Sequence, residues 1–562
     1  MTDDRYDDPL LPRRTALRLL GGAGLTAALA ACGGTSPAPT ASSGGGASGA
    51  PSTAPSAAPS AAPSVAPTAA SSVGTTATAA RATGTAASGG AGIVLPKTGA
   101  TIPSEKVTFR WTDSGDSKSV FFKQYFSTFQ STYPNITFQY DGLPWTEIAK
   151  VVPLGVQNSN APDVFQVPLT VPTFQAVKEG WVAPLDEIVP NFAQWKAAFP
   201  PNSFFEGINV FGGKTYTFPR STSKRTNNLV FYNLDYMQAA GYDPASKRLT
   251  WDEFRAAAKK ITEAGKGQYF GLITGGNQAS RWADTVNGLA QVAGASSIGN
   301  IDLKTGEFTF TRDQTVAAIE LLLALKSDNS VFPGSVSINE AESRSRVAQG
   351  LAGMVFAGEF ASPLWIRDNP NFKFGVAATP APNSGTPLPM SYQIGANHQW
   401  LYAKSGAANR TVAGEIFYFL GTEAGQTSFV TITDGSDPAA YDKANQQAKI
   451  DERTKRCYTF NEQLLRLGPM PVVRNAGVTQ VLLERKAVTP SFGEVIQGIF
   501  TGQVRDIKAA MRDVQDREEK ELERAIKAAQ GKGATVSRDD WKFANWNPTK
   551  DYADADYKAS KG

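Results

Sequence analysis

The sequence has almost no cysteine and almost no histidine. Among its 562 residues there are two cysteines, Cys32 and Cys457, and one histidine, His398. So small a supply provides no typical zinc cluster and no Cys–His pair, and it allows at most one catalytic triad that depends on histidine. We expect neither a metal nor a cofactor. Catalysis by carboxylates alone stays open.

Strong net charge and long apolar runs are also missing. The formal net charge is only +4, which gives no case for a nucleic-acid partner. Beyond the N-terminal segment, no apolar run approaches the roughly 18 residues that are needed to cross a bilayer. The residues from 104 to 562 are too many for one small core, so two or more lobes are expected.

The N-terminus has the pattern of an export signal. Arg13 and Arg14 precede a modestly apolar stretch over 16–31, which ends in Leu-Ala-Ala directly before Cys32. A charged region, a short apolar region and small residues before the processing point are typical of such signals. The ending resembles the lipobox of bacterial lipoproteins, which implies that Cys32 carries a lipid anchor. A chance Ala-rich run is the alternative, and the paired arginines leave the export route (Sec or twin-arginine) open.

Residues 33–103 consist almost wholly of Ala, Ser, Pro, Gly and Thr. Such a segment buries too little apolar surface to offset the entropy of ordering it. We therefore expect 32–103 to be a lipidated cysteine followed by a disordered tether. Cys457 then has no partner within the chain for a disulfide.

The body begins with the alternation of an α/β protein. Val107, Phe109 and Trp111 alternate with polar residues, which predicts a half-buried strand, and 136–140 repeats the pattern. Aromatic residues at helical spacing lie between them and predict a helix that Pro134 ends.

A second helix from about Trp145 and a short strand at 163–165 complete a strand–helix–strand–helix–strand order. This order implies a parallel sheet with right-handed crossovers. Ligands bind beyond the carboxyl ends of such strands, which points to the turns at 112–119, 142–145 and 166–173.

Two further helices can be placed. Thr250 is a predicted N-cap, and Glu253 three residues later completes a capping box. Near the C-terminus an apolar stripe of helical spacing runs from Val504 to Ile526. This stripe predicts a long closing helix that packs on the core.

Eight short motifs occur in a fixed order along the body. They are APDV at 161–164, EGWVAPLD at 179–186, FYN at 231–233, AGYDP at 240–244, TWDEF at 250–254, QGLAGM at 349–354, GEF at 358–360 and FGV at 374–376. In order and spacing they resemble the extracellular solute-binding proteins of ABC transporters, in the carbohydrate-binding branch that includes maltose-binding proteins. Phe360 stands where that family usually has Trp, and 541–562 has no counterpart.

The resemblance implies an α/β, two-lobed periplasmic-binding-protein (Venus-flytrap) fold, type II-like, with crossing hinge strands. The expected divisions are an export signal with lipobox at 1–31, the lipidated cysteine and tether at 32–103, lobe I at 104–219 and 381–470, lobe II at 220–380 and 471–530, and a C-terminal extension at 531–562. The chain crosses between the lobes more than once, so neither lobe is a contiguous segment.

A sugar pocket needs aromatic faces beside planar polar side chains, since sugars present both C–H patches and hydroxyl groups. Several segments combine the two where the resemblance implies ligand contacts, although burial in the core is the default for each aromatic residue. The candidate ligand-binding residues are Asp113, Asp116, Trp145, Gln166, Gln278, Trp282, Glu359, Phe360, Tyr392 and Gln393. Phe360 is the first choice for stacking, whereas Trp145 has the alternative of merely beginning a helix.

The resemblance further implies a lipoprotein that captures a sugar or oligosaccharide by lobe closure and delivers it to an ABC importer permease. It would be an exported monomer, held by its lipid on the outer face of the cytoplasmic membrane. No catalytic residue and no nucleic-acid partner are expected.

Two other classes of function stay open. The same fold could bind another solute, such as a peptide, a polyamine, a metal chelate or a sugar acid. A secreted glycoside hydrolase would need a pair of carboxylates on a sugar cleft, and nothing in the sequence marks one pair out. The basic segment 218–228 is either a solvated loop or a contact for an acidic ligand.

Overall fold

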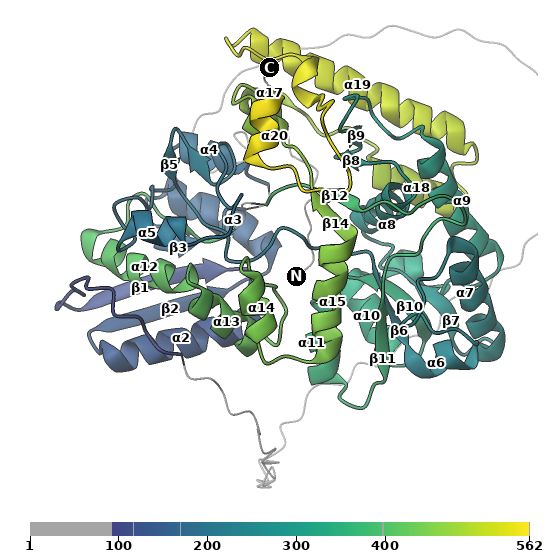
Figure 1. Ribbon diagram of the computed structural model, residues 1–562, viewed down its shortest axis with the longest axis horizontal. Coiled ribbons are helices and arrows are strands. Elements are labelled where there is room, and N and C mark those ends of the chain that lie inside the picture. Colours follow the sequence, from purple (N-terminus) through teal and green to yellow (C-terminus); the bar gives the residue numbers. More distant parts are fainter. Residues whose placement is uncertain (1–92, 116, 169, 396–397, 561–562) are drawn as a thin grey trace, which may run out of the picture. The chain divides into compact units, whose positions relative to one another are not determined.

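The computed structural model describes residues 93–562 except 116, 169, 396, 397, 561 and 562. The predicted signal, Cys32, most of the tether and Asp116 lie outside the described residues. Within the described part, no helix is both long enough and apolar enough to cross a bilayer. The body is α/β and contains two four-stranded sheets, whose strands and helices are labelled in Figure 1.

The first sheet has the strand order β13-β3-β1-β2. Its strands are β1 (Val107–Asp113), β2 (Ile136–Gly142), β3 (Val164–Phe165) and β13 (Trp400–Leu401). β1 pairs in parallel with both β2 and β3, as the sequence predicted, and β13 joins the far edge antiparallel. The late strand β13 is the element that sequence alternation did not predict.

Aromatic packing explains why β1 and its following helix lie together. The helix α2 (Lys118–Thr132) presents Phe122 and Phe126 to Trp111 of β1, with ring centroids 4.7 and 5.5 Å apart. Trp111 is fully buried. Each large aromatic side chain buries much apolar surface. The aromatic residues that the sequence places at helical spacing therefore stabilise the packing of α2 on the sheet.

The second sheet has the order β11-β6-β10-β7. Its strands are β6 (Leu229–Asn233), β7 (Phe270–Ile273), β10 (Ala352–Ala357) and β11 (Phe374–Ala377). β10 pairs in parallel with β7, whereas β6 pairs antiparallel with both β10 and β11. The second sheet is therefore mixed, with β6 running opposite to both of its neighbours.

Helices pack around both sheets, and the described residues also form three two-stranded sheets. The helices that follow the first sheet's segments are α3 (Trp145–Gln157), α4 (Thr173–Lys178), α5 (Phe192–Ala197), α12 (Ala407–Leu420), α13 (Glu423–Ile432), α14 (Asp442–Gln447) and α15 (Glu452–Leu464). Those of the second sheet are α6 (Leu234–Ala239), α7 (Trp251–Gly265), α8 (Ala279–Val292), α9 (Asp313–Ser327), η1 (Ser335–Ser337), α10 (Glu340–Ala348) and α11 (Ala361–Asp368). The remaining helices are α16 (Pro471–Arg474), α17 (Val478–Glu484), α18 (Phe492–Thr501), α19 (Ile507–Gln530), η2 (Arg538–Trp541) and α20 (Asp554–Ala559). The strand pairs are β4 (Val210–Phe211) with β5 (Lys214–Thr215), β8 (Ser297–Ile298) with β9 (Ile301–Asp302), and β12 (Met390–Tyr392) with β14 (Leu465–Leu467).

The predicted caps and closing helix are confirmed with one correction. Thr250 and Glu253 form a capping box at the start of α7. The closing helix α19 buries Met511, Val514 and Leu522, but it begins at Ile507, so Val504 lies before it. Asp506 caps the helix by accepting from the Ala509 N–H, which sets the start later than the apolar stripe suggested.

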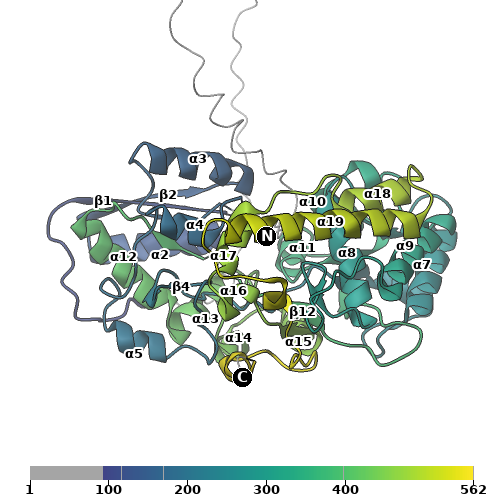
Figure 2. The same cartoon turned by 90° about the horizontal axis from the view of Figure 1, so that it is seen from above.

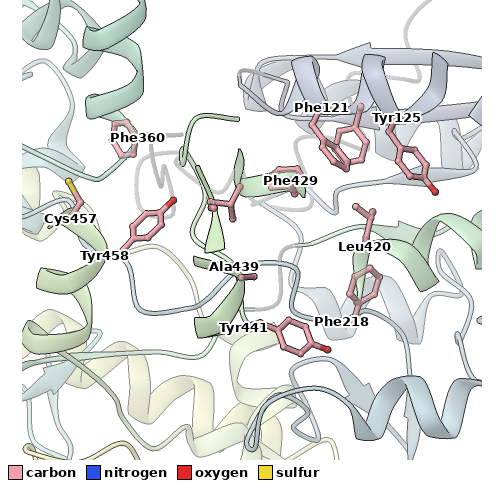
Figure 3. Packing of buried hydrophobic residues seen from close by; sticks show 14 of the residues in the cluster. Phe121, Tyr125, Phe218, Phe360, Leu420, Phe429, Ala439, Tyr441, Cys457 and Tyr458 are labelled. Carbon is pink, nitrogen blue, oxygen red and sulfur yellow. The ribbon is translucent and has the colours of Figure 1, made fainter. Parts of the chain in front are cut away.

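Two large clusters of buried side chains form the core. One joins the first sheet to α12, α13 and α15, and in it the rings of Phe121 and Phe429 lie 4.8 Å apart, near Tyr125 (Figure 3). The other joins α7, α8 and α9 to α17, α18 and α19. Figure 2 shows α19 lying along α17 and α18.

Both ends of the described chain pack on the body. Ile93 is 7% exposed and belongs to a core cluster, and Asn135 donates to the Pro103 carbonyl. Residues 93–103 therefore lie against the body instead of continuing the predicted disordered tether. At the other end, five aromatic residues of the C-terminal extension are at most 6% exposed: Trp541, Phe543, Trp546, Tyr552 and Tyr557.

Candidate functional site

A cavity of about 680 Å³ is the candidate functional site. It is lined by most of the segment 220–228 before β6, by one face of α8 and by Asp437. Ser391 and Tyr392 of β12 line it too, as do Gln393, Gly395 and His398, which follow that strand. Trp145 at the start of α3 and Gln166 directly after β3 also line it. The cavity thus touches the carboxyl end of the first sheet, where the sequence predicted ligand binding.

A close approach between α8 and segment 220–228 shapes one wall. Asn228 donates through its side-chain nitrogen to the Asp284 carbonyl, 3.1 Å away. A Cβ at Gly288 would lie 2.4 Å from that same nitrogen. Only glycine at this helix position lets the two segments come so near.

A buried network of opposite charges is part of the lining of the cavity. Arg220 and Arg225 both pair with the Asp437 carboxylate, at 3.1 and 2.8 Å. Arg225 also pairs with Glu359, which lies two residues after β10. The side chains of Arg220, Asp437 and Glu359 are each at most 3% exposed. The positive charge of this segment is therefore neutralised inside the protein.

The ionised form of Asp437 is stabilised by its neighbours. Burial opposes ionisation, but the positive charges of Arg225, Arg220 and Lys118 outweigh it and hold the pKa of Asp437 well below its ordinary value. Near neutral pH the network therefore contains a carboxylate rather than a carboxylic acid.

This pKa shift predicts a loss of stability in acid. An unfolded aspartate titrates near pKa 3.9, so between that value and the lower folded pKa the unfolded chain binds more protons, and stability falls as pH falls. We expect Asp437→Asn to remove about 1.4 kcal/mol per pH unit from the slope of unfolding free energy below about pH 4.

Urea denaturation at a series of acidic pH values measures that slope. Asp368→Asn is the matched control, because the pKa of Asp368 is also lowered by an arginine but its side chain is 53% exposed. Equal slopes for wild type and Asp437→Asn would contradict the prediction.

Aromatic faces and polar groups meet in the same cavity. Tyr392 makes a hydrogen bond from its hydroxyl to Thr226 Oγ1 at 2.8 Å, which orients its ring at the wall. Trp145 is half-buried. Phe360 is 3% exposed, and the Arg344 guanidinium lies 5.1 Å from its ring centre. Phe360 thus offers the cavity only a small part of its ring.

Planar amides add hydrogen-bonding groups. Gln166 accepts from the Ser114 N–H at 2.7 Å, and this contact ties the end of β3 to the turn after β1. Asn227 approaches Asp284 at 3.4 Å, and Gln393 follows β12. All of them line the cavity. Such groups match the hydroxyls of a polyol.

Six of the ten predicted residues line the cavity: Trp145, Gln166, Glu359, Phe360, Tyr392 and Gln393. Their role as ligand contacts stays a prediction. Trp145 both begins α3 and lines the cavity, so its two interpretations are compatible.

Three other predicted residues lie elsewhere in the described structure. Asp113 is fully buried and accepts from the Gly115 N–H and the Tyr140 hydroxyl. Gln278 precedes α8 and accepts from the Glu340 N–H. Trp282 is 2% exposed, with its ring 4.5 Å from that of Phe500. None of the three is among the described residues that line the cavity, because each is used to hold local structure.

No pattern in the sequence pointed to Asp437, which lies in a turn-rich segment after α13. It marked 218–228 as basic without indicating that Arg220 and Arg225 are paired. Within the described residues no group of three or more His, Cys, Asp and Glu side chains could hold a metal ion.

Solved structures with this fold cover most of the chain. An ABC-transporter solute-binding protein of Thermotoga lettingae with bound α-D-tagatose has a TM-score of 0.55 at 19% identity, over 74% of this chain and 99% of that one. Maltose-bound MalE3 of T. maritima gives 0.56 at 19% over 74% and 99%. UgpB of Mycobacterium tuberculosis with glycerophosphocholine gives 0.56 at 17% over 75% and 99%. At these identities the likeness shows the two-lobed fold alone.

The sequence comparisons reach the family. A binding protein of Brucella abortus is 27% identical over 267 residues, which is 47% of this chain and 61% of that protein. The chain thus spans less than two thirds of that relative. The family model for bacterial extracellular solute-binding proteins matches residues 113–427, more than half of the chain. The chain therefore belongs to the bacterial extracellular solute-binding proteins, a family of binding proteins rather than enzymes.

Proposed function

We propose that the protein captures a sugar or oligosaccharide in the cavity and delivers it to the permease of an ABC importer. The observation that carries this proposal is the lining itself, in which aromatic faces lie beside amides and a charge network that is already neutralised. Sugars need C–H packing and many hydrogen bonds but no net charge. The contacts are Trp145, Gln166, Glu359, Phe360, Tyr392 and Gln393.

The pairing of the basic segment favours a neutral solute over a sugar acid. Arg220 and Arg225 face Asp437 and Glu359, and Lys224 pairs with Glu462 and Asp551, both at 2.9 Å. An acidic ligand would have to displace one of these carboxylates. Two solved relatives in fold hold tagatose and maltose, and one holds glycerophosphocholine, so another polar solute is the second candidate.

The mechanism is closure of the two lobes around the solute. A ligand favours the closed form only to the extent that it binds that form more tightly. The protein would act as an exported monomer whose lipid on Cys32 keeps it close to the permease at high effective concentration. In this proposal lobe I consists of residues 104–219 and 381–470, and lobe II consists of residues 220–380 and 471–530.

A thermal-shift screen of the full chain against neutral sugars, sugar acids, polyols, polyamines and peptides tests the proposal. A ligand at about 100 times its dissociation constant adds roughly 2.7 kcal/mol of stability. Stabilisation by a neutral sugar with an affinity that does not change with salt is the expected result. Stabilisation only by polyamines or peptides would contradict the proposal that the solute is a sugar.

Trp145→Ala is expected to weaken binding of the sugar found in this screen by about threefold to tenfold, because a stacking face is lost. Isothermal titration calorimetry measures the change. Trp181→Ala is the matched control, since Trp181 donates to Glu179 outside the cavity lining. Unchanged affinity in Trp145→Ala would remove this residue from the site.

A further inference from the structure

The lining of the cavity includes a group of apolar side chains besides its polar ones. We call the part of the cavity that these apolar side chains line the apolar arm. Its apolar lining residues are Ile298, Ile301, Leu303, Phe310, Met470, Val472, Val478, Phe492, Trp541 and Phe543. Most of them are core side chains that are at most 9% exposed, so the walls of the arm are held by the packing of the second core cluster.

Backbone and ring contacts join the walls of the apolar arm. The Phe543 N–H donates to the Leu303 carbonyl at 2.8 Å. The rings of Phe310 and Phe492 lie 5.0 Å apart. The Met470 N–H donates to the hydroxyl of Tyr557 at 2.8 Å. The arm is therefore a built feature whose walls come from four separate stretches of chain.

The apolar arm is continuous with the polar part of the cavity. Asn300 of the β8–β9 turn donates to Asn287 of α8 at 2.6 Å, and both line the one cavity. Ser391, before the lining residue Tyr392, bonds Ser296 at 2.8 Å. Because both sets of residues line one cavity of about 680 Å³, a single ligand can contact both.

The arm depends on a segment that the family match does not include. The match covers 113–427, whereas Trp541 and Phe543 belong to the C-terminal extension. The extension thus adds aromatic walls to the cavity of this chain. The lining also includes Leu482, which is 40% exposed, and the charged residues Arg485, Lys486 and Glu518. Arg485 and Glu518 pair with each other at 2.6 Å.

We propose that the apolar arm receives an alkyl or aryl group of the solute, and that the solute is therefore a glycoside with an apolar substituent. Sugar hydroxyls placed in the arm would lose water without gaining enough partners, whereas an apolar group gains by leaving water. An unfilled apolar cavity costs packing energy, so an apolar occupant also stabilises the fold. That the polar end of the solute is a sugar rests on the proposed function. That the apolar arm binds an apolar group does not.

Fluorescence titration of the full chain with N-phenyl-1-naphthylamine tests the arm. We expect saturable binding, weakened about tenfold or more by Ile298→Trp, because the larger side chain fills the arm. Ile298 is half-buried at the lining, so it has room for the change. Leu154→Trp on α3, where Leu154 is 54% exposed and outside the lining, is the control and should bind as wild type.

Met470→Gln is a second variant in case Ile298→Trp does not fold, since it keeps the shape of the side chain and adds a polar group. It should also weaken binding of the naphthylamine. The proposal is overturned if the wild type shows no saturable binding, or if the folded arm variants bind as tightly as Leu154→Trp. If no sugar stabilises the protein but the naphthylamine binds in the apolar arm, the proposed sugar ligand is contradicted and the proposed role of the arm is not.

Discussion

Replacing Arg220 by methionine is expected to lower the free energy of unfolding by about 3–5 kcal/mol. Arg220 and Asp437 are a nearly fully buried pair, with side chains 3% and 2% exposed. Removing the arginine leaves Asp437 in a low-dielectric site with only Arg225 and Lys118 among the positive charges that stabilised it. The Arg220 guanidinium also lies 3.9 Å from the centre of the Phe429 ring, and that contact is lost too.

Urea denaturation measures the effect, and a surface pair supplies the control. Arg367 and Asp368 are 57% and 53% exposed, so Arg367→Met should cost no more than about 1 kcal/mol. The double variant Arg220→Met with Asp437→Leu should recover part of the stability, because the buried carboxylate is gone and Arg225 keeps Glu359 as its partner. A single variant as stable as wild type would show that Arg225 and Lys118 are enough to stabilise the buried Asp437 carboxylate.

Truncating Phe543 to alanine is expected to cost about 3–5 kcal/mol. Phe543 is fully buried, with ring centroids 5.6 Å from Tyr552 and 6.4 Å from Tyr557. The Arg474 guanidinium lies 5.3 Å from the same ring. The C-terminal extension is therefore part of the second core and not a detachable tail.

The midpoint of urea unfolding gives this measurement as well. Val94→Ala is the control, because Val94 is 79% exposed and its loss should change stability by at most about 0.5 kcal/mol. An unchanged midpoint for Phe543→Ala would mean that 531–562 folds apart from the body.

Several elements of the fold were predictable because their signals are local. Alternation at Val107, Phe109 and Trp111 became β1, and Phe109 and Trp111 are fully buried. The helix before Pro134 ends at Thr132. In each case the apolar spacing alone selects the conformation, since it matches the period of a strand or a helix.

Other features depend on segments far apart in the chain. β13 is only two residues long and is a strand because Trp400 and Leu401 pair with Phe165 and Val164. The aromatic residues of the C-terminal extension carry no periodicity, yet Phe543 is buried through its contact with Leu303. Local propensity cannot predict burial that a distant partner provides.

The candidate site divides in the same way. The turn positions of Trp145 and Gln166 follow from the strand–helix order, and both line the cavity. Trp282 was predicted from a motif position, but α8 turns it toward Phe500. Asp437 was missed because its importance comes from two arginines more than 200 residues earlier, at 220 and 225.

By itself the sequence determined the family, the parallel strands of the first sheet and several residues of the candidate site, because order, spacing and residue type are local properties of the chain. Only the tertiary structure decided which charges are paired, which aromatic residues are core, and that the C-terminal extension walls the cavity. Charge pairing and burial depend on distances between segments that are remote in sequence, and folding alone sets those distances.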